Sequence, residues 1–365
     1  MPDRSKILIL TSKTGGGHVT LAEIFRDLLE CDYEVEIIDP LPTFVHHHYS
    51  FVSRHALWLW EAEFRFWDTP RKSLIMHQGI SKLLARSFNN MLDDVQPSII
   101  ITTHPFLTYG IMRVLEKEYP HIPFVMLLTE LTRLHASSLT ERRATINLAP
   151  TDEVYSQALD AGFSPDRLHI VGWPVRSQFY QIDPSTRTRI LTQLHLNPDR
   201  FTIFLQGGGK GAARFEYAVE NILTACPDAQ IILAAGTNHT LLTRFQDTNN
   251  VYALPFTNQI APYMAAADVI MGKAGPNALF ESVALGKPFI ASSYIHGQEE
   301  ANLDFIRHHD LGWVVLKPEE QRDLIASLIA NPSRLQAKVA KIEAYRRSNS
   351  AANSSIAPLI RALVP

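Results

Sequence analysis

Residues 271–302 combine side chains and a turn that can bind a nucleotide. Lys273 to Pro276 forms a Gly-Pro turn after a short apolar run, and Asn277 to Leu285 has helical spacing with Glu281 in its middle. The N–H groups and the dipole at such a helix N-terminus attract phosphate. A carboxylate one turn further along can bind a ribose diol. The same pattern also fits one more strand-helix unit without a ligand, so shape alone leaves both interpretations open.

The elements that position this stretch repeat along the chain. An apolar strand at Ile7–Leu10 precedes glycines 15–17 and a helix, and a second strand at Phe201–Leu205 precedes glycines 207–209 and another helix. Doubly wound α/β sheets begin in this way, and ligands bind at the carboxyl ends of their strands. We therefore predict two Rossmann-like domains that face each other across a cleft.

Length and composition are consistent with two such domains. The chain has 365 residues, of which 46% are hydrophobic and 19% are charged, which suits two domains of about 150 residues each. The predicted boundaries are 1–178 for the first domain, 179–347 for the second and 348–365 for a C-terminal tail segment. The net charge of −3 gives no nucleic-acid signature. Two distant cysteines exclude a disulfide framework and a cysteine zinc site.

The first residues lead directly into a strand, without the pattern of a signal peptide. No run of apolar residues is long enough for a membrane span. We therefore expect a cytoplasmic protein.

Residues 44–88 are unusually rich in aromatic and basic side chains. Three of the five tryptophans, Trp58, Trp60 and Trp67, lie within ten residues. Residues 41–90 hold six Lys/Arg and three Asp/Glu, a net charge of +3 in a chain of −3. Such a segment suits an anionic bilayer surface, where aromatic rings lie at headgroup level. The alternative is a pair of core helices with solvated arginines.

The order and spacing of several motifs resemble the monogalactosyldiacylglycerol synthases and the related diacylglycerol glucosyltransferases, over about residues 6–315. The motifs are Thr14–His18 with Ala22, Thr103–Pro105, Ala149–Val154, Gly172–Arg176, Lys273–Pro276 and Tyr294–Asn302. The run Tyr294-Ile295 with Gly297-Gln298-Glu299 separates this family from the peptidoglycan N-acetylglucosaminyltransferases, which share the fold.

The resemblance implies a GT-B fold and an inverting glycosyltransferase. UDP-galactose or UDP-glucose would bind the C-terminal domain, and diacylglycerol would bind the N-terminal domain at the inner face of an anionic membrane. No metal is expected for catalysis, and the sequence contains no D-x-D motif. The negative charge of the leaving diphosphate must then be met by N–H groups, a helix dipole and Lys210 or Lys273.

The resemblance also implies roles for individual residues. His18 is the candidate general base, because we expect a helix N-terminus to lower its pKa and keep the imidazole neutral. The alternative for His18 is a capping or otherwise satisfied histidine. The expected acceptor-side residues are Gly16, Gly17, His104, Trp58, Trp60 and Trp67. The expected nucleotide-sugar residues are Gly207, Gly208, Gly209, Lys210, Phe256, Lys273, Gly275, Pro276, Asn277, Glu281, Gln298, Glu299 and Asn302.

Within the second set, Glu281 would bind the ribose hydroxyls, and Gln298 and Glu299 would bind those of the hexose. Phe256 would lie near the uracil or pack in the core. Asn277 can cap the helix that it begins.

The sequence departs from the family pattern mainly on the acceptor side. Where the family has a Thr-Asp pair, this chain has Thr129-Glu130. Where the family has His-Pro-Thr-Trp, this chain has His135-Ala136-Ser137-Ser138. These changes leave two alternatives open. The acceptor could be polyprenyl-linked or soluble, or the protein could bind a UDP-sugar without transferring it, as an epimerase would. The sequence does not choose between galactose and glucose.

Overall fold

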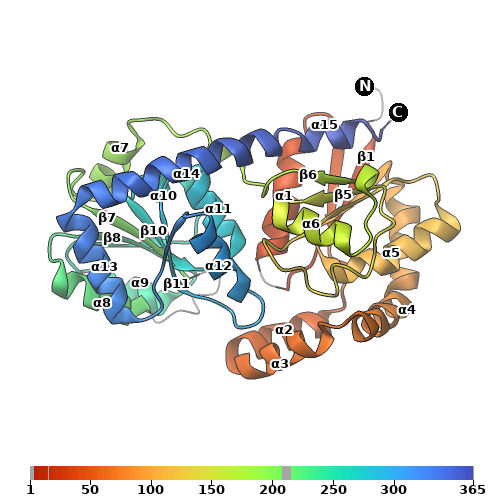
Figure 1. Cartoon of the computed structure of the whole chain (residues 1–365), viewed down its shortest axis with the longest axis horizontal. Coiled ribbons are helices and arrows are strands. Elements are labelled where there is room, and N and C mark those ends of the chain that lie inside the picture. The colour runs from red at the N-terminus through yellow and green to blue at the C-terminus, as the bar shows by residue number, and fades with distance from the viewer. Residues whose placement is uncertain (1–3, 15, 208–214, 365) are drawn as a thin grey trace. The chain divides into compact units, whose positions relative to one another are not determined.

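The computed structural model describes residues 4–14, 16–207 and 215–364 (Figure 1). It divides into two compact units. Unit 1 contains Met1–Pro174, His296–Gln298 and Asn349–Pro365, and unit 2 contains Val175–Ile295 and Glu299–Ser348. The first division therefore follows Pro174, four residues before the predicted boundary, and the last residues of the chain group with unit 1.

Unit 1 is built on a six-stranded parallel sheet with strand order β2-β1-β3-β4-β5-β6. Its strands are β1 (Lys6–Leu10), β2 (Glu34–Ile38), β3 (Ile99–Thr102), β4 (Phe124–Leu127), β5 (Ile146–Ala149) and β6 (Leu168–Ile170). The central strands are short apolar runs that are buried on both faces, as expected for a parallel sheet covered by helices.

The helices of unit 1 include three consecutive ones, α2 to α4, that are inserted between β2 and β3 (Figure 1). The helices are α1 (Gly17–Leu29), α2 (Thr43–His55), α3 (Leu57–Trp67), α4 (Pro70–Val95), α5 (Pro105–Glu118), α6 (Asp152–Asp160) and α15 (Ile356–Arg361), with a 3-10 turn at Pro165–Arg167. The aromatic and basic segment therefore forms three helices, whereas the core-packing alternative assumed a pair.

Unit 2 is built on a second six-stranded parallel sheet, with strand order β12-β11-β10-β7-β8-β9. Its strands are β7 (Thr202–Gln206), β8 (Gln230–Gly236), β9 (Val251–Pro255), β10 (Val269–Lys273), β11 (Phe289–Ser293) and β12 (Gly312–Val314). Its helices are α7 (Thr186–Gln193), α8 (Phe215–Ala225), α9 (His239–Phe245), α10 (Ala261–Ala265), α11 (Pro276–Ala284), α12 (Glu300–His308) and α13 (Pro318–Ala330), with a 3-10 turn at Ser177–Phe179. Helix α14 (Pro332–Asn353) begins in unit 2 and ends in unit 1.

Helix α11 ends at the glycine that the sequence indicates. Gly286 has a φ of +68°, a conformation that glycine adopts without steric cost. The N–H of Lys287 then donates to the carbonyl of Ser282 (2.9 Å), which closes the helix end.

Both sheets reverse their strand order beside the first strand of the unit. In unit 1, β1 lies between β2 and β3, with Leu10 opposite Thr102. In unit 2, β7 lies between β8 and β10, with Gln206 opposite Gly272. The loops that follow these paired strands therefore leave the sheet next to each other, where doubly wound folds bind ligands. The predicted doubly wound α/β class is confirmed.

Candidate active site

His18 lies on the first turn of α1, next to the end of β3. Its Nδ1 donates to the carbonyl oxygen of Thr103 (2.6 Å), and the hydroxyl of Thr103 donates to the carbonyl of His18 (3.0 Å). A carbonyl can only accept, so Nδ1 must carry the proton. In the neutral ring, Nε2 therefore holds the lone pair that a general base needs.

His104 packs against His18, with ring centroids 4.4 Å apart. It follows β3 and caps α5, because its Nδ1 accepts the N–H of Phe106 (3.3 Å). In the neutral ring, Nε2 then carries the proton and donates to the hydroxyl of Thr14 (3.0 Å). The segments that follow β1 and β3 thus hold two histidines with opposite tautomers.

Both histidines are neutral at pH 7. Burial lowers the pKa of His18 to about 4, against the opposing effect of the hydrogen bond to Thr103. Burial, and then the charge of His18, lower the pKa of His104 well below its usual value. The pKa of His18 is lowered, as expected, but the main cause is desolvation and not the helix N-terminus.

The glycines before His18 leave open space. Gly16 and Gly17 are exposed, and a side chain added at Gly16 would meet no atom within 4 Å. Packing therefore does not require glycine at position 16.

The altered acceptor-side residues bind each other. The hydroxyl of Ser138 donates to Glu130 Oε1 (2.6 Å), and the N–H of Thr129 donates to Oε2 (3.1 Å). Burial raises the pKa of Glu130 to about 7, although these hydrogen bonds oppose the shift. Two departures from the family pattern are thus linked in one polar pair after β4.

In unit 2, neighbouring strands deliver the predicted phosphate-binding turns. Gly207 is buried directly after β7, and Lys273 ends β10, the adjacent strand. Gly208, Gly209 and Lys210 lie outside the described residues.

Helix α11 begins one residue earlier than expected. Pro276 occupies its first position and Gly275 is the N-cap, with no side-chain cap. The expectation that Asn277 caps this helix is therefore wrong, because proline needs no hydrogen-bond partner at the first position and takes that place.

Glu281 lies on α11 and is paired with a residue that the sequence reasoning did not assign. Arg176 donates from Nη2 to Glu281 Oε1 (2.8 Å), and its other Nη donates to the carbonyl of Asn258 (3.4 Å). Burial raises the pKa of Glu281, while Arg176 lowers it. The motif Gly172–Arg176 was the available signal for this residue.

Two of the three polar residues predicted around α12 contact the turn before α11. Glu299 accepts from the ammonium of Lys273, and Asn302 Nδ2 donates to the carbonyl of Ala274 (2.8 Å). Gln298 is exposed. Glu299 and Asn302 therefore bind protein groups in the turn that precedes α11.

Phe256 follows β9 and is 68% exposed. This exposure excludes the alternative that Phe256 packs in the core. Its backbone N–H donates to the carbonyl of Gly236 (3.1 Å), which fixes the loop that carries the ring.

The three tryptophans differ in exposure. Trp58 is 74% exposed. Trp60 packs edge-on against Tyr49 (ring centroids 5.2 Å apart) with its indole N–H buried, and Trp67 packs edge-on against Phe66 (5.0 Å). Among the residues with described coordinates, no helix combines the length and apolarity that crossing a bilayer demands.

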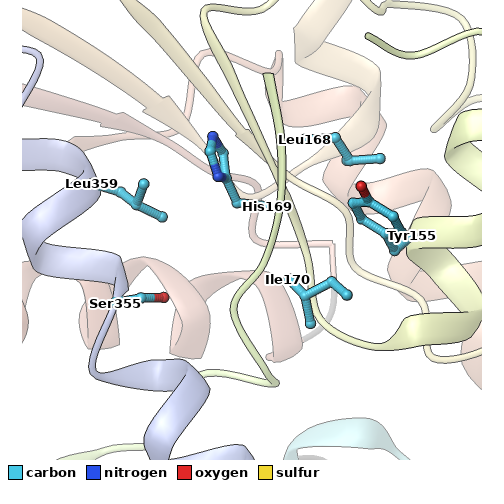
Figure 2. Close-up of a pocket in the computed structure, with 6 residues that line it drawn as sticks. All are labelled: Tyr155, Leu168, His169, Ile170, Ser355 and Leu359. Carbon is cyan, nitrogen blue, oxygen red and sulfur yellow. The ribbon is translucent and has the colours of Figure 1, made fainter. Parts of the chain in front are cut away.

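An open pocket lies elsewhere in unit 1. Figure 2 shows its lining, Tyr155 from α6, Leu168 to Ile170 from β6, and Ser355 and Leu359 at α15. None of the predicted site residues lines this pocket. It is therefore separate from the histidine pair at the ends of β1 and β3.

The two parallel sheets and the loops at their carboxyl edges define a GT-B fold of the glycosyltransferase type. Residues 27–175 match the family model for monogalactosyldiacylglycerol (MGDG) synthase, and residues 202–358 match that for the glycosyltransferase family 28 C-terminal domain. The resemblance inferred from the sequence motifs is thereby confirmed, since each half of the chain matches one of these two family models.

Individual relatives agree with these domains. The chain is 29% identical over 350 residues to a probable monogalactosyldiacylglycerol synthase of Nicotiana tabacum, covering 88% of this chain and 64% of that one. It is 26% identical to the processive diacylglycerol beta-glucosyltransferase of Staphylococcus saprophyticus, covering 93% and 89%. The chain thus spans less than two thirds of the length of the tobacco relative.

A solved structure supports the fold alone. Anabaena HepE, in complex with UDP-glucose, superposes with a TM-score of 0.59 at 16% identity, covering 98% of this chain and 99% of that one.

Thr14, Thr103 and Arg176 are the site residues that sequence reasoning missed. Thr14 and Thr103 bind the two histidines, and Arg176 binds Glu281. Each lies inside a motif that carries the family resemblance, so the signal was present. The motif alone did not show which neighbour each side chain would contact.

Proposed function

We propose that this protein transfers galactose or glucose from its UDP form to the free hydroxyl of diacylglycerol, with inversion at the anomeric carbon. The two family-model matches and the named activities of the relatives support the reaction class. The observation that carries the proposal is the tautomer of His18, because its Nε2 is left as a neutral base.

The proposed step is a single in-line displacement. The acceptor hydroxyl oxygen forms a bond to the anomeric carbon, while the bond from that carbon to the diphosphate oxygen breaks and UDP leaves with the electron pair. His18 Nε2 accepts the hydroxyl proton as the new bond forms. The Nδ1 proton donated to Thr103 keeps the ring oriented and stabilises the imidazolium that results.

The leaving diphosphate would be met by unit 2. Gly207 and the turn at Gly275 follow adjacent strands, and the N-terminus of α11 adds a partial positive charge. Lys273 would add a full charge beside it. We therefore propose that transfer does not require a metal.

The remainder of the nucleotide would lie along α11 and β9. Glu281, held by Arg176, would accept hydrogen bonds from the ribose hydroxyls. The exposed ring of Phe256 would stack on the uracil. Gln298 is exposed and would reach the hexose.

We further propose that helices α2 to α4 bind an anionic bilayer. Eight of the thirteen exposed large apolar side chains in the described part of the chain lie on these three helices. They are Phe44, Phe51, Leu57, Trp58, Phe66, Leu74, Ile75 and Leu83. Exposed cations accompany them on α4, namely Arg71, Lys82 and Arg86. Apolar insertion combined with lipid electrostatics suits a peripheral protein.

A direct assay tests the activity. The purified protein would be incubated with labelled UDP-galactose or UDP-glucose and vesicles that contain diacylglycerol and an anionic lipid. We expect a labelled glycolipid with one donor or both. If neither donor gives a glycolipid, the proposal fails. Transfer to a polyprenyl phosphate, or epimerisation of UDP-N-acetylglucosamine without an acceptor, would establish one of the two alternatives.

A further inference from the structure

We propose that Glu299 is a positioning residue that acts through Lys273, and that it does not itself hold the hexose. In this arrangement Glu299 fixes the Lys273 ammonium at the first turn of α11, where the diphosphate of UDP is expected. The inference rests on the proposed function for the identity of that ligand. It changes the role that motif reasoning assigns to Glu299.

The contacts of Glu299 engage both of its carboxylate oxygens. The ammonium of Lys273 donates to Oε1, and the backbone N–H of Ile295 donates to Oε2 (2.9 Å). The Glu299 side chain is 6% exposed and that of Lys273 is 24% exposed. The carboxylate is therefore turned into the protein, and the more accessible member of the pair is the cation.

The pair lies directly against the turn that precedes α11. A methyl group added at Gly275 would lie 3.3 Å from Lys273 Nζ and 3.4 Å from Glu299 Oε1. Gly275 is the N-cap of α11, so the ammonium sits at the positive end of that helix. Glycine at this position leaves room for the ion pair.

A residue on the first turn of α12 supports the same turn. Glu299 is the N-cap of α12, and Asn302 lies three residues later, on the first turn of that helix. The Asn302 amide is buried and donates to the carbonyl of Ala274 (2.8 Å), the residue between Lys273 and Gly275. Glu299 and Asn302 thus hold the segment 273–275 through the Lys273 side chain and the Ala274 carbonyl.

Holding the lysine in advance has a physical consequence for binding. A free lysine side chain loses rotamer entropy when it is fixed by a ligand. If Glu299 fixes it before UDP arrives, that cost is already met within the folded protein, and affinity rises.

The direction in which one mutation changes UDP affinity distinguishes this role from a simple electrostatic effect. Removing a negative charge near a bound diphosphate would by itself strengthen UDP binding. Loss of a positioning residue predicts the opposite. We expect Glu299→Gln to weaken UDP binding by roughly tenfold, the size of one charge-assisted hydrogen bond. Isothermal titration with UDP, without acceptor, measures this change.

Matched variants complete the test. Glu300→Gln removes the same charge from the adjacent, exposed position, and we expect UDP affinity to be unchanged. Asn302→Ala should weaken UDP binding without changing any charge. In a Lys273→Met background, Glu299→Gln should have no additional effect, because the residue acts through the lysine.

Three results would overturn the inference: unchanged or tighter UDP binding by Glu299→Gln with an unchanged melting temperature, additive effects in the double variant, or a loss confined to UDP-hexose relative to UDP. The last result would support the role expected from the sequence, in which Glu299 binds the hexose hydroxyls. If the wild-type protein binds no UDP at all, the proposed function fails, which is a different outcome from any of these three.

Discussion

His18 illustrates how one hydrogen bond sets the chemistry of a side chain. The carbonyl of Thr103 determines which nitrogen carries the proton, and the partly buried position of the ring keeps it neutral. His104 has the opposite tautomer because its Nδ1 accepts a backbone N–H. Although the rings are in contact, only His18 has a lone pair left on Nε2. We therefore expect the two histidines to respond differently to substitution.

The first residue-scale prediction concerns the base. His18→Ala should lower turnover by roughly two to four orders of magnitude, the usual contribution of a general base. UDP affinity should be nearly unchanged, because the contacts proposed for UDP lie in unit 2. Single-turnover assays and UDP titration measure the two effects. His121→Ala, at an exposed histidine of the same unit, is the matched control. Weaker UDP binding with normal turnover would contradict the role of His18.

The pH dependence of the reaction follows from the pKa of His18. With a pKa of about 4, the base stays neutral well below the ordinary histidine value of 6.5. The acid limb of kcat/KM should therefore lie below about pH 5. Glu130 follows β4, the strand next to β3, and its pKa of about 7 would add a limb of its own. The pH profile is best measured in Glu130→Gln, which removes the carboxyl limb. An acid limb with a midpoint near 6.5 in this variant would contradict the lowered pKa of His18.

At the scale of elements, helix α3 explains why its tryptophans differ. The helix has no fully buried residue, so its apolar side chains either cover their neighbours or face outward. Trp60 and Trp67 cover neighbours through ring contacts, whereas Trp58 faces outward. The ammonium of Lys72, on α4, lies 3.8 Å from the centre of the Phe66 ring. A cation beside an exposed aromatic ring is the combination expected at a lipid headgroup layer.

The exposed members of this surface give an element-scale prediction. Replacing Phe51 and Trp58 with Ser should reduce sedimentation with anionic vesicles by several-fold, since each exposed ring contributes apolar area to insertion. Thermal stability should change little, because both rings are already exposed. Tyr217→Ser, at an exposed aromatic residue of α8, is the control. Equal sedimentation of both variants would assign the apolar face to another partner.

At the scale of the whole molecule, the histidines with strongly lowered pKa values in the described part of the chain all belong to unit 1. They are His18, His77 and His104, and burial is the largest cause for each. The ring of His77 is fully buried on α4 near Phe106 and Tyr109. In the unfolded chain each would titrate near 6.5. The folded unit binds fewer protons than the unfolded chain between about pH 6.5 and 4, so its stability falls as the pH is lowered through that range.

Glu130 acts in the opposite sense. Its pKa is raised to about 7, so its contribution to stability falls as the pH rises from about 4.5 to 7. Three histidines outnumber this one carboxyl. We therefore expect the net stability of unit 1 to fall on acidification from pH 7 to pH 5.

A variant at His77 isolates this effect. His77→Leu removes one of the three groups from an apolar site and should reduce the difference between the urea midpoints at pH 7 and pH 5. The stability of the variant relative to wild type should be higher at pH 5 than at pH 7. His121→Leu should leave the pH difference as in the wild type. If His77→Leu keeps the full wild-type pH difference, burial of this ring does not drive the acid sensitivity.

The sequence by itself determined the parts of this protein that depend on local pattern. Short apolar runs, glycine turns and helical spacing specified two doubly wound sheets, because strand and helix periodicity are properties of neighbouring residues. Gly286 ended its helix as expected, since a left-handed residue is a local requirement. Motif order indicated the family, which the domain matches confirmed.

Only the tertiary structure decided which side chains meet. Thr103 meets His18 across 85 positions, Arg176 meets Glu281 across 105, and Glu299 meets Lys273 across 26. Local sequence pattern does not predict such pairs, because strand order and helix packing bring the two residues together. Likewise, only the structure showed that Trp58 is exposed, whereas Trp60 and Trp67 pack against neighbouring rings. The motifs therefore indicated the residues of the candidate site, and the fold determined which neighbours their side chains contact.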